Sequence, residues 1–153
     1  HEESSFSRGE VFAKKREVIA SSFSSKIGKA LLKRKTALFS DSTDSLKVAI
    51  SLSKRYDRND QHYWYAYLDP MRRFLKSSKN TFMIYGCMDK DYAFAIPYEK
   101  IEEWRHGMNS TPPKQNRSEY WHITLRETQE AMILALPRSG IEIDLEPYKF
   151  TIK

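Results

Sequence analysis

The chain has 153 residues, enough for one hydrophobic core, and its 40% hydrophobic and 13% aromatic content excludes a wholly disordered protein. No apolar run approaches the roughly 20 residues that cross a bilayer, and the first residues lack the hydrophobic stretch of a secretory signal. We therefore expect no membrane partner and a cytoplasmic, intracellular location. The formal net charge is +6 at pH 7.

The positive charge is concentrated in the first part of the chain. Residues 1–58 contain 13 Lys and Arg against 7 Asp and Glu, whereas residues 59–153 contain 13 of each sign. A localised excess predicts a basic face that attracts a polyanion, which an evenly spread charge would not. The alternative is a solvated helix surface without a partner.

An amphipathic helix, or two, is expected over residues 9–39, because apolar side chains recur there at close to the 3.6-residue period. The serines of residues 21–25 and Gly28 favour a break near them. Cations flank the apolar stripe, and those assigned to phosphate contacts are Lys14, Lys15, Arg16, Lys33, Arg34 and Lys35. Residues 40–45 consist of turn-forming residues and are expected to be a linker.

From residue 46 onward the apolar period changes to two. Residues 46–53 alternate strictly and predict a half-buried strand, and residues 62–68 predict a second, aromatic strand. Short helices are expected at residues 69–76 and 97–105, and a loop at residues 106–118. The remaining strands are expected at residues 81–87, 92–96, 119–125, 131–136, 141–144 and 148–152.

These elements predict an α+β fold with a basic amphipathic N-terminal helical segment (1–39), a linker (40–45) and an aromatic-rich, β-dominated core (46–153), all in one structural unit. Because no long helix joins successive strands, the sheet should be mostly antiparallel. Six or seven strands with two short helices are typical of a strongly curved sheet or a half-open barrel. Small barrels of the PUA-like group offer an architectural analogy.

Two kinds of side chain in the β-dominated part could contact a nucleic acid. The loop at residues 53–61 offers cations for phosphates and a ring for base stacking, from Lys54, Arg55, Tyr56 and Arg58. Aromatic residues could also form a pocket for a flipped or modified base, and the candidates are Trp64, Tyr65, Trp104, Tyr120, Trp121 and His122. Each ring taken alone is more often part of a core than of a pocket.

Signatures of catalysis and of cofactors are missing from the sequence. No Asp or Glu is followed two residues later by Lys, the pattern of the commonest restriction nucleases, and there is no Walker loop or glycine-rich dinucleotide fingerprint. The histidines lack the spacing of metal ligands, and Cys87 is the only cysteine, which excludes an internal disulfide and a multi-cysteine zinc site. We therefore assign no catalytic residue, metal or cofactor.

The sequence thus predicts a nucleic-acid-binding module, with DNA favoured over RNA. No motif in the sequence identifies a family. The hypothesis includes the recognition domain of a restriction or defence-type protein, which would read a modified or flipped base. Two alternatives stay open. The N-terminal helix could dock its apolar stripe into a protein partner or a second copy of the chain, or the chain could be a small metal-dependent nuclease.

Overall fold

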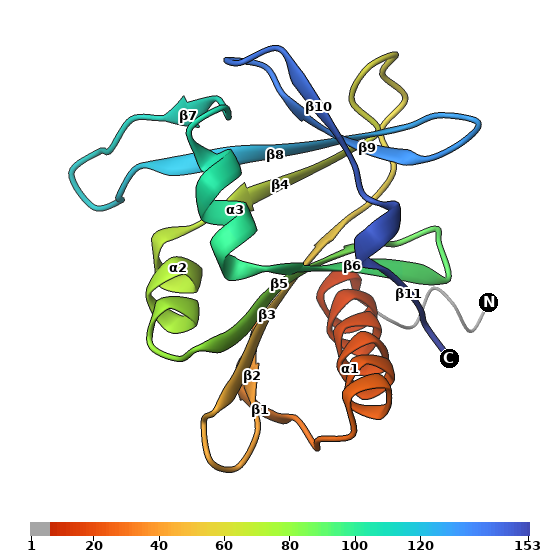
Figure 1. The fold of residues 1–153 in the computed structure, drawn as a ribbon, viewed down its shortest axis with the longest axis vertical. Helices are drawn as coiled ribbons and strands as arrows, with labels where there is room; N and C mark the ends of the chain where they lie inside the picture. Colours follow the sequence, from red (N-terminus) through yellow and green to blue (C-terminus); the bar gives the residue numbers. More distant parts are fainter. Residues whose placement is uncertain (1–6) are drawn as a thin grey trace.

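The computed structural model describes residues 7–153 and shows an α+β fold built in layers (Figure 1). One long helix, α1 (Arg8–Ile27), packs on one face of a six-stranded sheet, which we call sheet A. The other face of sheet A packs on a five-stranded sheet, sheet B. The predicted α+β class is therefore confirmed.

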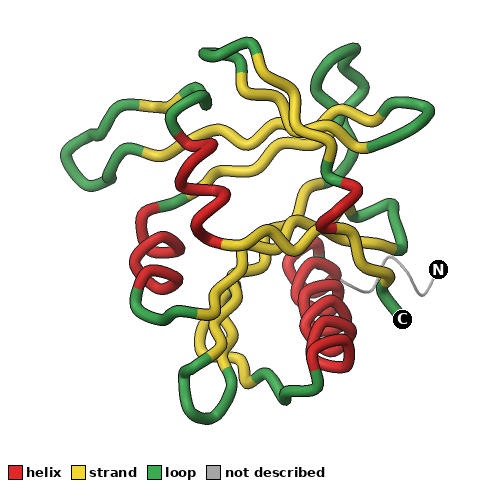
Figure 2. Tube along the Cα trace, in the orientation of Figure 1, coloured by secondary structure: helices red, strands yellow, loops and turns green. Residues whose placement is uncertain are grey.

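Sheet A has the strand order β1-β2-β3-β5-β6-β11. Figure 2 shows the strands of the fold in yellow and its helices in red. The neighbouring strands of sheet A are antiparallel except β3 and β5, which are parallel because the chain passes through β4 and α2 between them. The strands of sheet A are β1 (Leu32–Lys35), β2 (Leu38–Ser40), β3 (Leu46–Ser53), β5 (Asn80–Cys87), β6 (Tyr92–Pro97) and β11 (Lys149–Thr151).

Sheet B has the order β10-β9-β8-β4, with β7 also paired to β8, and every pair in it is antiparallel. The strands of sheet B are β4 (Tyr63–Tyr67), β7 (Ser110–Thr111), β8 (Tyr120–Glu127), β9 (Met132–Leu136) and β10 (Ile141–Asp144). The strands thus divide between two sheets, and neither closes into a barrel, so the half-open barrel and the PUA-like form are not confirmed.

Two short helices and one 3-10 turn complete the described chain, namely α2 (Asp69–Lys76), α3 (Tyr98–Arg105) and η2 (Glu146–Tyr148). Helices α2 and α3 contact strands of sheet A, and their buried side chains join the core between the two sheets. No helix of residues 7–153 has the length and apolar character needed to span a membrane.

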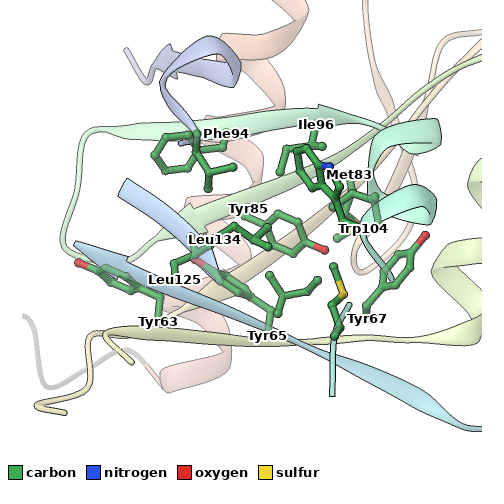
Figure 3. Packing of buried hydrophobic residues seen from close by; sticks show 14 of the residues in the cluster. Tyr63, Tyr65, Tyr67, Met83, Tyr85, Phe94, Ile96, Trp104, Leu125 and Leu134 are labelled. Atoms are coloured by element: carbon green, nitrogen blue, oxygen red, sulfur yellow. The ribbon is translucent and has the colours of Figure 1, made fainter. Parts of the chain in front are cut away.

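The core between the sheets is rich in aromatic side chains (Figure 3). Strict alternation along β4 places Tyr63, Tyr65 and Tyr67 there with exposed fractions of 0 to 2%. A second core lies between α1 and the opposite face of sheet A, where Ile19 and Phe23 are buried. The central part of sheet A is consequently covered on both faces, so β3, predicted to be half-buried, has neighbours on both sides.

The predicted helix over residues 9–39 is shorter in the structure. Helix α1 begins after a capping box formed by Ser7 and Glu10 and ends before Gly28, whose left-handed φ of 73° suits glycine. Residues 32–40 form the β1–β2 hairpin instead of continuing a helix, because β2 pairs with β3 and Phe39 is buried beside α1. Residues 1–6 of the predicted segment lie outside the described residues.

The segment expected to be a linker, residues 40–45, is a tight turn between β2 and β3. The Asp41 carboxylate accepts hydrogen bonds from the Leu46 N–H (3.1 Å), the Ser45 N–H (2.9 Å) and the Thr43 hydroxyl (2.9 Å). These bonds, led by the one from Leu46, lower the pKa of Asp41 to about 2, against an opposing effect of burial. The turn therefore fixes β2 beside β3 rather than separating two parts of the chain.

Candidate functional site

The outer face of sheet B presents the residues that alternate with the aromatic core. On β4 this face carries Trp64 and Ala66, and on β8 it carries Tyr120, His122 and Thr124, all of them half-buried. The strand register sets Ala66 opposite His122. The three described α-helices make their main contacts with sheet A (Figure 1), so the outer face of sheet B remains accessible.

Three rings on this face form an aromatic cluster, which consists of Trp64, Tyr120 and His122. The Trp64 and His122 ring centroids are 5.4 Å apart at an interplanar angle of 67°, and the Trp64 indole N–H donates to His122 Nδ1 at 3.1 Å. Tyr120 stacks on His122 with centroids 5.4 Å apart and planes 16° apart. Each ring is therefore held by its neighbours while part of its surface stays in solvent.

The hydrogen bonds of His122 define its protonation state. An indole N–H can only donate, so His122 Nδ1 must accept and carries no proton. The proton of the neutral ring then lies on Nε2, which is 2.7 Å from the Thr111 hydroxyl oxygen. Burial lowers the pKa of His122 below its ordinary value, so the structure favours the neutral ring.

A groove of about 390 Å³ runs between the aromatic cluster and the loop that precedes β4. Trp64 and His122 line it from the sheet, and Tyr56, Arg58 and Gln61 line it from the loop. The backbone N–H of Tyr56 donates to the carbonyl of residue 62 at 2.8 Å, which closes the base of the loop. The volume falls within the roughly 300–1,000 Å³ of small-molecule pockets.

Arg58 lines this groove, and two further cations lie over tyrosine rings beside it. Among the ion pairs formed within residues 7–153, none with N···O of 4.0 Å or less involves Lys54, Arg58 or Arg117. The Arg117 guanidinium carbon lies 5.0 Å from the Tyr120 ring centroid, and Lys54 Nζ lies 5.2 Å from the Tyr56 centroid. Lys54 and Arg58 are exposed and therefore available to an anion, whereas Arg117 also donates to the Pro112 carbonyl at 2.9 Å.

Arg55, from the same loop, has a different role. Its guanidinium donates to Glu127 Oε1 at 2.6 Å and to the Tyr63 hydroxyl at 3.1 Å, and the hydrogen bond to Glu127 is the main cause that raises the pKa of Arg55. Lys90 donates to the second Glu127 oxygen at 2.7 Å. Arg55 thus joins the loop to β8 and is not free for a phosphate.

The predicted cations of α1 lie away from the groove, because α1 and sheet B lie on opposite faces of sheet A. Lys15 donates to the Lys90 carbonyl at 2.7 Å, and Arg16 donates to the Ile50 carbonyl at 3.2 Å. Burial lowers the pKa of Arg16. Lys14 is exposed on the same helix.

The predicted cations of β1 are exposed at the edge of sheet A. Arg34 is held by the Ser40 hydroxyl at 2.7 Å and lies 3.6 Å from the Asp44 carboxylate. Lys33 and Lys35 take part in none of the ion pairs found within residues 7–153. The structure therefore does not bring the helix and hairpin cations together with the groove.

The other three pocket candidates, Tyr65, Trp104 and Trp121, are buried between the sheets with exposed fractions of 2%, 7% and 9%. The Tyr65 hydroxyl donates to the Gly86 carbonyl at 3.0 Å. Two guanidinium groups lie over the Trp121 ring, with the guanidinium carbons of Arg72 and Arg105 at 4.8 Å and 4.5 Å from the ring centroid. These rings stabilise the core and do not line the groove.

One groove residue, Gln61, and two residues that contact the aromatic cluster, Arg117 and Thr111, were not predicted from the sequence. Gln61 and Arg117 lie in loops, where no apolar period points to a surface, although Arg117 precedes Tyr120 by three residues. Thr111 lies in β7, which has only two residues and is too short to show alternation. Within the described residues, no group of three or more His, Cys, Asp or Glu side chains could hold a metal ion.

No protein-family model, curated protein or solved structure matches the chain. The groove is therefore interpreted from its own geometry.

Proposed function

We propose that the chain is a nucleic-acid-binding module that holds an unpaired base in the groove on the outer face of sheet B. The observation that carries the proposal is the composition of this groove, in which Trp64 and His122 offer ring surfaces beside Arg58 and Gln61. Stacking of a base on an aromatic side chain contributes about 1–3 kcal/mol. The Gln61 amide beside the rings matches the donor and acceptor groups of a base edge.

The cations around the groove support a phosphate backbone as the second half of the ligand. Lys54 and Arg58 come from the loop on one side of the aromatic cluster, and Arg117 lies over Tyr120. Asp57 and Asp60 are exposed in the same loop and limit its net charge. This balance favours a short single-stranded segment, or a base flipped out of DNA, over extended contact with a duplex backbone.

Fluorescence anisotropy with labelled oligonucleotides tests the proposal. We expect single-stranded DNA to bind more tightly than the matched duplex, and affinity to fall as salt increases, because bound phosphates release counterions. RNA of the same sequence, and DNA with and without a methylated base, establish which polymer and which base are preferred. Absence of binding at low salt, or affinity that does not depend on salt, contradicts the proposal.

The matched variants are Trp64→Ala and Phe12→Ala. Trp64 lines the groove, so its removal should weaken binding about tenfold or more. Phe12 is a half-buried ring on α1, remote from sheet B, and its removal should leave affinity unchanged. Equal losses in both variants would show that the ligand does not occupy the groove.

A further inference from the structure

We propose that His122 is the positioning residue of the groove, and that its neutral form holds the Trp64 ring in the orientation that receives a base. The inference rests on the proposed function and adds to it a requirement for unprotonated His122. It starts from the hydrogen bond of 3.1 Å between the Trp64 indole N–H and His122 Nδ1. This is the only hydrogen bond of the Trp64 side chain within residues 7–153.

Protonation of His122 removes this hydrogen bond. In the imidazolium form both ring nitrogens carry a proton, so Nδ1 would bring a second donor against the indole N–H. Two donors cannot share one contact at this distance, and one of the rings must turn away. The Thr111 hydroxyl can accept from Nε2 in both forms, so it anchors His122 without distinguishing them.

The rings around His122 leave it half-buried, and this burial opposes an added positive charge. From β4 the ring faces Trp64 and Ala66, from β7 it faces Thr111, and from β8 it is stacked on Tyr120. Among the charged side chains nearby, Arg58 lines the same groove, Arg117 lies over Tyr120, and Glu119 accepts from the Ser110 hydroxyl at 2.7 Å. The loop that carries Arg58 also exposes Lys54, Asp57 and Asp60.

This arrangement predicts a pH dependence with an unusual sign. A surface that binds a polyanion by charge alone binds more tightly on acidification, because protonated histidines add positive charge. The groove should instead lose affinity as His122 becomes protonated, since Trp64 is released. The sign of the change therefore separates positioning by His122 from a general effect of charge.

The test measures binding of a fluorescein-labelled single-stranded DNA oligonucleotide at constant ionic strength between about pH 8 and about pH 5, the range in which histidines titrate. The His122→Phe variant keeps a ring against Tyr120 but lacks the acceptor, and we expect it to bind about fivefold more weakly at all pH values. The His122→Asn variant offers a carbonyl oxygen near the Nδ1 position and cannot titrate. We expect it to stay within about threefold of the wild type at pH 8 and to lose the pH dependence.

Nitrogen NMR of the histidine ring supplies a readout that needs no ligand. We expect Nδ1 of His122 to be unprotonated and Nε2 to carry the proton, and the fall in affinity to follow the measured titration of this ring. Wild-type binding that stays constant or strengthens while His122 protonates, or a His122→Phe variant that binds like the wild type, overturns the positioning role and leaves the proposed function intact. Failure of the wild type to bind at any pH overturns the proposed function itself, whatever the NMR tautomer.

Discussion

The two sheets alternate their side chains in the same way but differ in what covers their second face. In sheet A, Val48 and Ile50 point toward α1 and are fully buried, while Ala49 between them is buried toward sheet B. In sheet B, Tyr65 is buried toward sheet A, while its neighbour Trp64 is half-buried on the outer face. Helix α1 covers the second face of sheet A, whereas the outer face of sheet B has no such cover, and this difference explains the contrast in burial.

The side chains on these two faces differ according to whether a helix covers them. The face of sheet A beneath α1 carries aliphatic and phenylalanine side chains, none of which needs a hydrogen bond. The uncovered face of sheet B carries Trp64, Tyr120 and His122, rings that combine an apolar surface with a polar atom and so tolerate both burial and water. A face of this kind can bind a flat polar ligand, whereas the covered face serves stability alone.

The largest expected effect tests the covered face. Phe23 is 1% exposed and packs on Phe82 and Phe150 with ring centroids 5.4 Å away in both cases. The Phe23→Ala change should lower the free energy of unfolding by about 3–5 kcal/mol, because it removes a large buried ring and leaves a cavity. Urea unfolding followed by circular dichroism measures this loss.

The control lies on the same helix. Val11 is 44% exposed, so Val11→Ala should change the free energy of unfolding by less than about 0.5 kcal/mol. If Phe23→Ala costs less than about 1 kcal/mol, α1 does not cover sheet A as described.

The second largest expected change in stability concerns the hydrogen bonds that connect helix α3 with sheet B and helix α2. Glu102 on α3 accepts from the Tyr67 hydroxyl at 2.8 Å and from Arg72 at 2.9 and 3.0 Å. Burial acts to raise the pKa of Glu102, but these bonds outweigh it and lower the pKa. Glu102→Gln should destabilise the fold by about 2 kcal/mol, a value reduced for partial exposure to solvent.

The lowered pKa of Glu102 also fixes the sign of a pH effect. Its contribution to stability is complete above the pKa of the unfolded chain and is lost as the pH falls through the lower, folded value. The wild type should therefore lose stability on acidification more steeply than Glu102→Gln in thermal unfolding at a series of pH values. Parallel curves for the two proteins would contradict the assigned contacts.

Local sequence signals located most strands but not their partners. The strict alternation of residues 46–53 predicted β3 with its observed bounds, and the aromatic residues 62–68 enclose β4. Periodicity does not reveal pairing, so the parallel contact of β3 with β5 and the division into two sheets were not predicted. Residues 32–39 were expected to be helical because their few apolar residues continue the 3.6-residue period, and only pairing with β3 selects the hairpin.

The sequence predicted the type of residue in the candidate site, but not which residues belong to it. Trp64, Tyr120 and His122 were predicted as pocket candidates together with Tyr65, Trp104 and Trp121, but the sequence could not tell which of these rings face the core. That choice depends on which faces are covered, which is a tertiary property. Thr111, the partner of His122, is found only when the fold brings β7 beside β8.

A smaller change in stability should distinguish two tyrosines in the core between sheets A and B. The Tyr85 hydroxyl is buried without a hydrogen-bond partner within the described residues, whereas the Tyr65 hydroxyl donates to the Gly86 carbonyl. Tyr85→Phe should leave stability unchanged or raise it by about 1 kcal/mol, and Tyr65→Phe should lower it by about 1 kcal/mol. Chemical denaturation of the two variants compares them directly, and a reversed order would refute the assigned hydrogen bonding.

The smallest expected effect compares exposed cations on the two sheets. Arg58 lines the groove of sheet B, and Lys35 lies on the edge strand β1 of sheet A. If only the groove holds the single strand, Arg58→Ala should reduce by about one the number of counterions released on binding, with a loss of affinity below about 1 kcal/mol at moderate salt. Lys35→Ala should leave both the salt dependence and the affinity unchanged. Equal slopes in the two variants would mean that the ligand extends from sheet B to the basic edge of sheet A, and the contrast between the sheets would then apply to base contacts alone.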